Sequence, residues 1–377
     1  MPAPIIKFPG GGASLALGVV LLSALQGISA AAFPDTMSVG WRFKVGEPVS
    51  QTPAVNGHGI YAVTDRGGVV ALNSEGVKRW TATLPKMPRP PQELFSTPPL
   101  WVNGLIIAGT DKGLIYAFDS ENRILKWKVK IGDDIYGALN WMKPDDKHGV
   151  SVIALSRNNG SLYRLDLTNG RVIWASKPCG RSDGSPAVGT GLIVFGGCDS
   201  ALHYISADTG DVVGKTEFEE RGPVAGGVTI DGNQAFVGTR DGSIVCADLK
   251  TFCLVWTNRV AESEIFTTPA VTADRIVAGS NDGSIYCLNR ADGKKIWSVS
   301  TQGNPTSPLV VGDQVVVTSG GALSLLKLAD GKTVWIDKVC DSMSPPAVTS
   351  GKMIVGTDDG YIVLFQPASQ TGTEEIP

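Results

Sequence analysis

Short runs of apolar residues, each ended by a tight polar turn, follow one another along almost the whole chain. The segment 276–297 is the clearest case and reads IVAGSNDGSIYCLNRADGKKIW. A β-branched run precedes the turn 281–283, a second apolar run follows it, and the turn 291–293 leads to a third run that ends on Trp297. Because Asp-Gly steps supply the positive φ angles that tight hairpin turns require, the pattern predicts three antiparallel strands.

Copies of this unit repeat along the chain, and a short apolar run before each copy adds a fourth strand, as at 268–271. Most copies end on a tryptophan, but one has Gly214 in that place. The further copies occupy 61–80, 106–127, 152–174, 193–215, 236–256 and 315–335. The closing tryptophans are Trp41, Trp80, Trp127, Trp174, Trp256, Trp297 and Trp335. A period of about 40 residues with four strands per unit predicts the blades of a β-propeller.

The two ends of the chain complement each other. The segment 354–365 begins an eighth copy but stops before its tryptophan strand, and Trp41 lies in an unattached strand of the missing type. The sequence therefore predicts an all-β fold, an eight-bladed propeller of four-stranded antiparallel blades over residues 38–366. Pairing of the N-terminal strand with the last blade would close the ring and remove a free sheet edge. Each tryptophan is expected to pack between neighbouring blades, with a thinner contact at Gly214.

The first residues differ in composition from the rest. A lone Lys7 precedes an apolar run, 13–28, and three alanines follow it. This pattern predicts a signal peptide over 1–32 and export to the periplasm or extracellular space, with an uncleaved N-terminal anchor as the alternative. No later segment is long and apolar enough to span a bilayer, so we expect no integral membrane protein after cleavage. Residues 367–377 are predicted to be a disordered tail, and the mature protein is expected to be a monomer.

The balance of charged residues does not favour nucleic acid or an anionic membrane as a partner. The chain carries 33 basic and 36 acidic residues, a net charge of −3, which gives no indication of a nucleic-acid or anionic-membrane surface.

Export permits disulfides, and the chain has 6 cysteines. Cys179 and Cys198 are expected in loops on the same face of one blade, which makes them the favoured pair. Cys246 and Cys253 flank a hairpin turn and could bond across its strands. Cys287 and Cys340 are expected to be unpaired thiols.

Other motifs are better explained by turns than by chemistry. The segment 180–184 matches G-x-S-x-G, but a nucleophile elbow requires a strand, a turn and a helix, and this segment lies between β-blades. The 3 histidines are too scattered for a zinc site. The Asp-Gly turns lack the alternate oxygen ligands of a calcium loop.

Loops on the propeller faces are the expected binding surfaces, because packing occupies the strands. The Pro-rich insertion 85–95 places Arg89, Leu94 and Phe95 in one such loop. These residues form the first candidate partner-binding surface, with a cap on the second blade as the alternative role of Phe95. Arg181, close to the expected disulfide, is a second candidate on the same face.

The repeated pattern G-[ST]-x-D-G-x-[IL]-Y-x-[LF]-[DN]-x-x-x-G-[KR]-x-x-W resembles the quinoprotein-like, or PQQ-like, repeat. With eight repeats and no other domain, the chain is most similar to the family of the outer-membrane assembly factor BamB. That resemblance implies a non-catalytic scaffold with a protein partner in the cell envelope. The family is typically lipid-anchored, and this chain has no lipobox cysteine near its predicted cleavage site.

The resemblance also implies alternatives. Enzymes with this repeat bind pyrroloquinoline quinone (PQQ) and calcium at the propeller centre, and use an adjacent Cys-Cys pair and long insertions that this chain lacks. We therefore expect no cofactor, neither PQQ nor calcium, and no enzymatic activity. A propeller that binds a carbohydrate or another small ligand in its channel is a further alternative.

Overall fold

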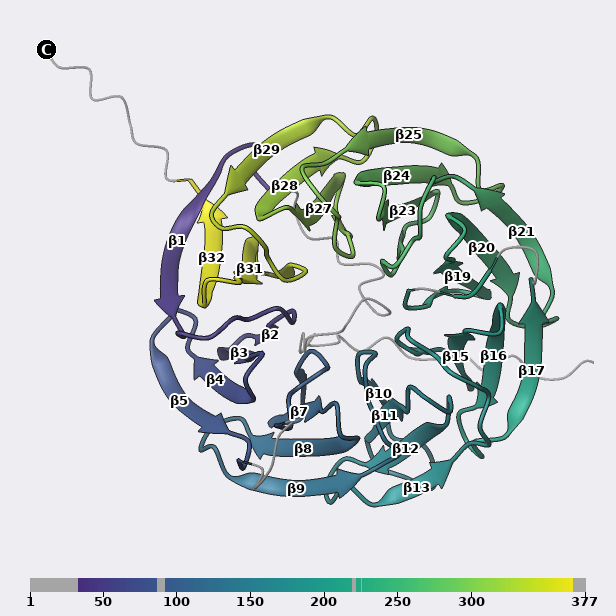
Figure 1. Ribbon diagram of the computed structural model, residues 1–377, viewed down its shortest axis with the longest axis horizontal. Helices are drawn as coiled ribbons and strands as arrows, with labels where there is room; N and C mark the ends of the chain where they lie inside the picture. Colours follow the sequence, from purple (N-terminus) through teal and green to yellow (C-terminus); the bar gives the residue numbers. More distant parts are fainter. Residues whose placement is uncertain (1–32, 87–91, 219–221, 225, 369–377) are drawn as a thin grey trace, which may run out of the picture.

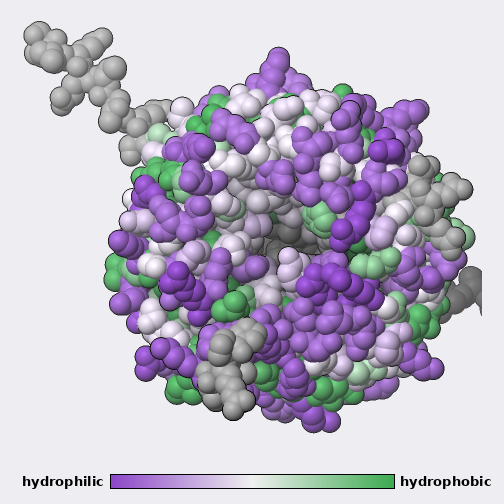
Figure 2. All heavy atoms as spheres, viewed as in Figure 1, coloured by the Kyte–Doolittle hydropathy of each residue, from purple (hydrophilic) through white to green (hydrophobic). Residues whose placement is uncertain are grey.

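A ring of eight antiparallel sheets makes up the computed structural model, which describes residues 33–86, 92–218, 222–224 and 226–368 (Figure 1). Each sheet has 4 strands, and the described residues contain no helix. The predicted eight-bladed propeller is confirmed. Seen down its axis, the ring is hollowed at its centre, and much of the face in view is hydrophilic (Figure 2).

The first four blades follow the chain in order from the inner to the outer strand. Blade 1 contains β2 (Ala54–Asn56), β3 (Gly59–Val63), β4 (Gly68–Leu72) and β5 (Lys78–Thr83). Blade 2 contains β6 (Leu100–Val102), β7 (Leu105–Gly109), β8 (Leu114–Asp119) and β9 (Leu125–Lys130). Blade 3 contains β10 (Asn140–Met142), β11 (Ser151–Leu155), β12 (Leu162–Asp166) and β13 (Val172–Ala175). Blade 4 contains β14 (Ala187–Val188), β15 (Leu192–Gly197), β16 (Ala201–Ser206) and β17 (Val212–Glu217).

The remaining blades repeat this order, except that the last takes its outer strand from the N-terminus. Blade 5 contains β18 (Thr229–Asp231), β19 (Gln234–Gly238), β20 (Ser243–Asp248) and β21 (Leu254–Arg259). Blade 6 contains β22 (Ala270–Val271), β23 (Arg275–Ser280), β24 (Ser284–Asn289) and β25 (Lys295–Ser300). Blade 7 contains β26 (Leu309–Val311), β27 (Gln314–Ser319), β28 (Ala322–Lys327) and β29 (Thr333–Lys338). Blade 8 contains β30 (Ala347–Thr349), β31 (Lys352–Gly356), β32 (Tyr361–Pro367) and β1 (Met37–Lys44).

Pairing of β1 with β32 closes the ring as predicted, with Met37 opposite Pro367 and Lys44 opposite Tyr361. Hydrogen bonds to blade 7 also fix the residue Phe33, which precedes β1. The side-chain amide of Gln314 in blade 7 donates to the Phe33 carbonyl at 2.9 Å and accepts its N–H at 2.7 Å. The predicted signal peptide lies outside the described residues, as does the predicted tail from residue 369 on, so both stay predictions.

The ring has two distinct faces. The outer strands begin at one face, beside the tight turns that connect them to the third strands, and we call this the turn face. They end at the other face, which carries the connections between blades, and we call this the loop face. Because Met37 lies opposite the end of β32, the N-terminal strand also begins at the turn face.

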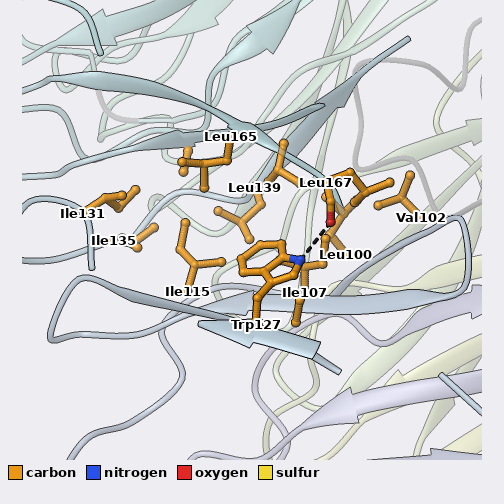
Figure 3. Close-up of a cluster of buried hydrophobic side chains, with 13 residues drawn as sticks. Leu100, Val102, Ile107, Ile115, Trp127, Ile131, Ile135, Leu139, Leu165 and Leu167 are labelled. Carbon is orange, nitrogen blue, oxygen red and sulfur yellow. Dashed lines mark hydrogen bonds between the residues drawn. The ribbon is translucent and has the colours of Figure 1, made fainter. Parts of the chain in front are cut away.

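The outer-strand tryptophan joins each blade to the next. Trp127 of blade 2 is buried among apolar residues of blades 2 and 3, and its indole N–H donates to the Leu167 carbonyl at 2.8 Å (Figure 3). The indole also lies against Gly170, whose φ is +71° and whose added Cβ would lie 2.5 Å from the ring. The turn of blade 3 therefore supplies both the hydrogen-bond acceptor and the flat surface on which the indole packs.

This contact recurs around the ring, and its acceptor is always a backbone carbonyl in the third-to-outer turn of the next blade. The donor–acceptor pairs are Trp41–Ser74 at 3.3 Å, Trp80–Ser120 at 3.0 Å, Trp174–Ala207 at 3.3 Å, Trp256–Arg290 at 3.1 Å and Trp297–Leu328 at 2.9 Å. Trp335 faces blade 8, where β1 replaces the continuous turn, and packs edge-on against Phe365 at 5.6 Å between centroids.

The contact at Gly214 is not thinner, which corrects the sequence prediction. Phe252, in the turn of blade 5 at a position where most blades have glycine, packs against Tyr204 of blade 4 with 4.5 Å between ring centroids. A Cβ at Gly214 would lie only 2.4 Å from the Phe252 ring. Thr216 donates to the Phe252 carbonyl at 2.7 Å, in place of the missing indole N–H. Here the outer strand supplies the small residue and the turn supplies the large one, the reverse of the tryptophan contacts.

Most outer strands carry a β-bulge beside the tryptophan. In blade 2, Ala117 pairs with Trp127 and Phe118 with Leu125, so that Lys126 has no partner in the ladder. A bulge adds local twist. It lets the indole point between blades while the extra residue faces solvent, and this exposes a side chain at the turn-face end of each outer wall.

Gly170→Ala tests the packing of the indole on the turn. The positive φ and the overlap with the indole should lower the free energy of unfolding by about 1–3 kcal/mol. Gly104→Ala is the matched control, because its φ is also positive, at +80°, and nothing lies within 4 Å of its added Cβ. Urea denaturation measures both, and equal stability of the two variants would contradict the packing described here.

The exchange at blade 4 is tested by a double-mutant cycle. Gly214→Trp alone should be strongly destabilising, because the indole would overlap Phe252. Combined with Phe252→Gly, it recreates the arrangement of the other blades, so a coupling free energy of more than about 1 kcal/mol is expected. Additive effects in the denaturation series would show that these residues do not share one space.

Candidate interaction surface

One carboxylate gathers three arginines on the loop face of blades 3 to 5. Asp183 lies between β13 and β14, and its side chain is only 7% exposed. Its Oδ1 accepts from Arg157 Nε at 2.7 Å and from Arg181 Nη2 at 3.1 Å. Its Oδ2 accepts from Arg240 Nη2 at 3.3 Å. Because each arginine comes from a different loop or turn, the carboxylate connects three consecutive blades.

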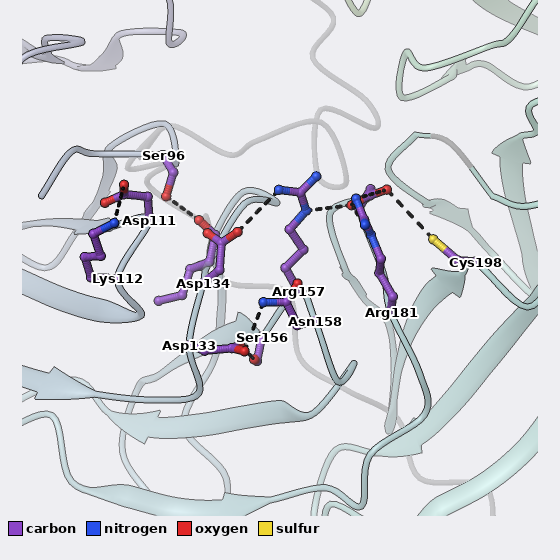
Figure 4. Close-up of polar contacts among 12 residues, drawn as sticks. Ser96, Asp111, Lys112, Asp133, Asp134, Ser156, Arg157, Asn158, Arg181 and Cys198 are labelled. Carbon is purple, nitrogen blue, oxygen red and sulfur yellow. Dashed lines mark hydrogen bonds and ion pairs between the residues drawn. The ribbon is translucent and has the colours of Figure 1, made fainter. Parts of the chain in front are cut away.

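A second carboxylate extends this network toward blade 2. Asp134, between β9 and β10, accepts from Arg157 Nη1 at 3.3 Å through Oδ2 (Figure 4). Its Oδ1 is buried and has no hydrogen-bond partner in the described part of the chain. We call Asp134, Arg157, Arg181, Asp183 and Arg240 the arginine cluster. With three guanidinium groups and two carboxylates, it has a net charge of +1.

The charges of the cluster stabilise one another. Burial disfavours the charged form of Asp183, but the hydrogen bonds and charges of Arg157 and Arg181 outweigh it, so the pKa of its carboxyl lies below the ordinary value. The hydrogen bond that Arg157 donates to Asp183 raises the pKa of Arg157 in return. The pair of Asp183 and Arg157 therefore stays ionised at neutral pH.

Exposed aromatic rings flank the cluster. The guanidinium of Arg157 lies 4.5 Å from the ring centroid of Tyr136, which is 53% exposed. The guanidinium of Arg240 lies 5.0 Å from the ring of Phe266, also exposed, in the loop that leads to blade 6. Cation–π contacts of this kind hold both partners in place while one face of each stays in water.

Backbone hydrogen bonds hold the loop that carries Arg181. The Arg181 carbonyl accepts a hydrogen bond from the N–H of Cys198 at 2.8 Å, and the N–H of Ser182 donates to the Arg157 carbonyl at 2.9 Å. The buried Ser182 hydroxyl donates to the Gly196 carbonyl at 2.6 Å. This serine of the G-x-S-x-G match is therefore a structural residue in a loop between strands.

The residues of the two predicted binding surfaces have different roles in the structure. Arg181 belongs to the arginine cluster and is half exposed. Phe95 is buried, pairs with Thr110 and packs edge-on against Tyr116 at 6.3 Å between centroids, so it caps blade 2. Leu94 is half buried beside it, and Arg89 lies outside the described residues.

The predicted disulfides are not formed in the structure, where all six cysteines are free thiols. Cys246 is buried opposite Trp256 in the β20–β21 ladder, whereas Cys253 lies exposed in the turn. The thiol of Cys179 donates to the Lys177 carbonyl, and that of Cys198 donates to Asp183, so these two thiols have different partners.

The sequence analysis missed Arg157, Arg240, Tyr136 and Phe266. A signal existed in the turn between the second and third strands of each blade. After its Ser or Thr, this turn has Asp65, Asp111, Asn281 or Asp358 in other blades, but arginine in blades 3 and 5. An alignment of the repeats would have revealed two basic substitutions on neighbouring parts of one face.

The described part of the chain contains no set of side chains suited to binding a metal ion. No group of three His, Cys, Asp or Glu side chains there could hold an ion. No helix among the same residues is long and apolar enough to cross a membrane.

Comparison with known proteins identifies the family. The family model described as "Outer membrane protein assembly factor BamB" matches residues 26–176 and 198–344, more than half of the chain. The chain belongs to the BamB family.

Individual relatives agree with this assignment. The chain is similar to BamB of Burkholderia pseudomallei, with 27% identity over 299 residues, 74% of this chain and 73% of the relative. It is 23% identical to BamB of Escherichia coli over 348 residues, 75% of this chain and 86% of the relative.

Solved structures share the propeller fold. The crystal structure of BamB from Moraxella catarrhalis superimposes with a TM-score of 0.71 and 18% identity, covering 88% of this chain and 98% of that chain. A computationally designed protein, Ika8, gives a TM-score of 0.70 at 13% identity, covering 86% of this chain and 97% of that one. The fold alone therefore does not specify a function.

Asp183→Asn tests whether the carboxylate holds the cluster together. Loss of its charge leaves three guanidinium groups facing one another and should lower the free energy of unfolding at pH 7 by about 2 kcal/mol. Because the folded pKa is lowered, this contribution is complete above the unfolded value of about 3.9 and is lost as the pH falls through the folded value.

The deficit of Asp183→Asn should accordingly shrink below about pH 4. Denaturant unfolding at pH 7 and pH 3 measures it, with Asp146→Asn in an exposed loop as the control. A deficit that does not change with pH would contradict a role for the charge.

Proposed function

We propose that this protein is a non-catalytic scaffold for outer-membrane protein assembly and that it docks a protein partner of the cell envelope through the arginine cluster. Family membership supports the general role, since the relatives are named outer membrane protein assembly factors. The proposal includes no cofactor. The observation that carries the docking site is the row of arginines and exposed aromatic rings across blades 3 to 6.

The side chains at this surface suit a protein interface. Tyrosine and arginine are enriched among the residues that dominate binding energy, and Tyr136 and Arg181 both remain accessible. Asp183 already orders the three guanidinium groups, so these side chains would lose less conformational entropy when a partner binds. Most arginine N–H groups remain able to donate, and a partner with carboxylates beside apolar side chains would complement them.

Position on the ring also favours docking here. The cluster lies on loops and turns, where side chains can change without disturbing the ladders. It spans several consecutive blades held by indole contacts and, between blades 4 and 5, by Phe252, and a rigid surface needs little rearrangement on binding. The proposed location is the periplasm.

The docking site is tested by Arg181→Glu combined with Phe266→Ser in the full chain. Partner recovery after co-purification from envelope extracts should fall at least about tenfold, because both a charge and an apolar contact are lost. Lys332→Glu, a charge reversal on the opposite face, is the control and should leave recovery unchanged.

Thermal unfolding of each variant confirms that the ring is intact. Recovery of the same proteins in equal amount from the double variant and the control would place the docking site elsewhere.

A further inference from the structure

The turn-face edge of blades 1 and 2 combines aliphatic and basic side chains. Val77, in the turn before β5, is 60% exposed, and Ile124, in the turn before β9, is 57% exposed. Leu125, the first residue of β9, is exposed beside Ile124. These side chains extend from the outer corner of the ring, where neighbouring blades do not cover them.

Positive charge surrounds these aliphatic groups. Residues 73–79 and 119–128 contain five basic and three acidic side chains, a local charge of +2 within a chain whose net charge is −3. Lys126 and Lys128 point outward from β9, are exposed, and have no ion-pair partner among the described residues. Of the acidic groups, Asp119 accepts N–H bonds within its own turn and Glu121 pairs with Arg79.

The equivalent edge of blade 4 differs in charge. Val212 and Val213 are exposed there as well, so the aliphatic character is shared. The segment 206–215, which matches 119–128, carries Asp208 and Asp211 against Lys215, a local charge of −1, and Asp208 pairs with Lys147 of blade 3. The aliphatic residues alone reflect the outer-strand pattern.

The same edge of blades 6 and 7 is also basic, but Arg290, Lys294 and Lys332 there pair with Asp231, Asp292 and Asp330. Blades 1 and 2 differ in that most of their basic side chains at this edge have no ion-pair partner among the described residues.

The chain approaches the ring from this same face. β1 begins at the turn face, and Phe33 is clamped there to Gln314 of blade 7. The preceding residues include the apolar run 13–28. If that run is kept as an anchor, its attachment point brings the turn face toward the bilayer and leaves the arginine cluster on the opposite face for a protein partner.

We propose that the turn-face edge of blades 1 and 2 is a peripheral docking surface for an anionic phospholipid bilayer. Val77, Ile124 and Leu125 would enter the headgroup region, while Lys126 and Lys128 contact lipid phosphates. Basic residues near an anionic surface each add to membrane affinity, and aliphatic side chains add burial. The acidic edge of blade 4 would be repelled, which tilts the ring toward blades 1 and 2.

Vesicle binding tests this surface. A chain that starts at Phe33 contains every strand of the ring, so residues 33–377 can be used without the apolar run. The probes are vesicles of phosphatidylcholine alone and vesicles with phosphatidylglycerol. The ring should sediment with the anionic vesicles at low salt, and Lys126→Glu with Lys128→Glu should reduce its partitioning at least about tenfold.

The control pair is Lys294→Glu with Lys332→Glu, which makes the same charge change on the turn face of blades 6 and 7. It should lower partitioning by less than about threefold, since those lysines already pair with Asp292 and Asp330. Thermal unfolding shows that all variants are folded. Absence of binding to anionic vesicles, equal binding to neutral ones, or equal loss in the two pairs would overturn the proposal.

Discussion

The contact between an outer-strand indole and the turn of the next blade is the interaction on which the ring depends. Each blade is a small sheet that cannot bury its own faces, so it is stable only between two neighbours. The indole combines a large apolar surface with one directed hydrogen bond, and therefore fixes both the spacing and the orientation of the neighbouring blade. Because the blades form a closed circle, the pairing of β1 with β32 affects every blade.

The blade 4–5 contact shows what this interaction requires. Gly214 and Phe252 reverse the usual positions of the large and small residue, yet the interface is filled and a hydrogen bond to the turn carbonyl is kept. This interface thus keeps one large side chain, one small residue and one donor, although the two blades supply them the other way round.

The sequence determines the local part of this structure. Turn residues and tryptophan spacing predicted the strands, the number of blades and the closing strand, because each depends on a repeat within the chain. The arginine cluster could not be predicted in this way, since Arg157 and Arg240 lie 26 and 57 residues from Asp183 and meet it only through the curvature of the ring. The expected pairing of Cys246 with Cys253 failed because the hairpin register places Trp256 opposite Cys246.

The arginine cluster and the turn-face edge of blades 1 and 2, the two proposed binding surfaces, lie on opposite faces of this ring, and the contacts between blades hold them in place. Hydrogen exchange of the indole N–H groups tests the central claim most directly, because it observes the contacts between blades themselves. The account predicts that the indole N–H groups of Trp80, Trp127 and Trp297 exchange only with global unfolding, at one common rate. Rapid exchange of these groups in the folded protein, or a different rate at each, would contradict a ring held together by these contacts.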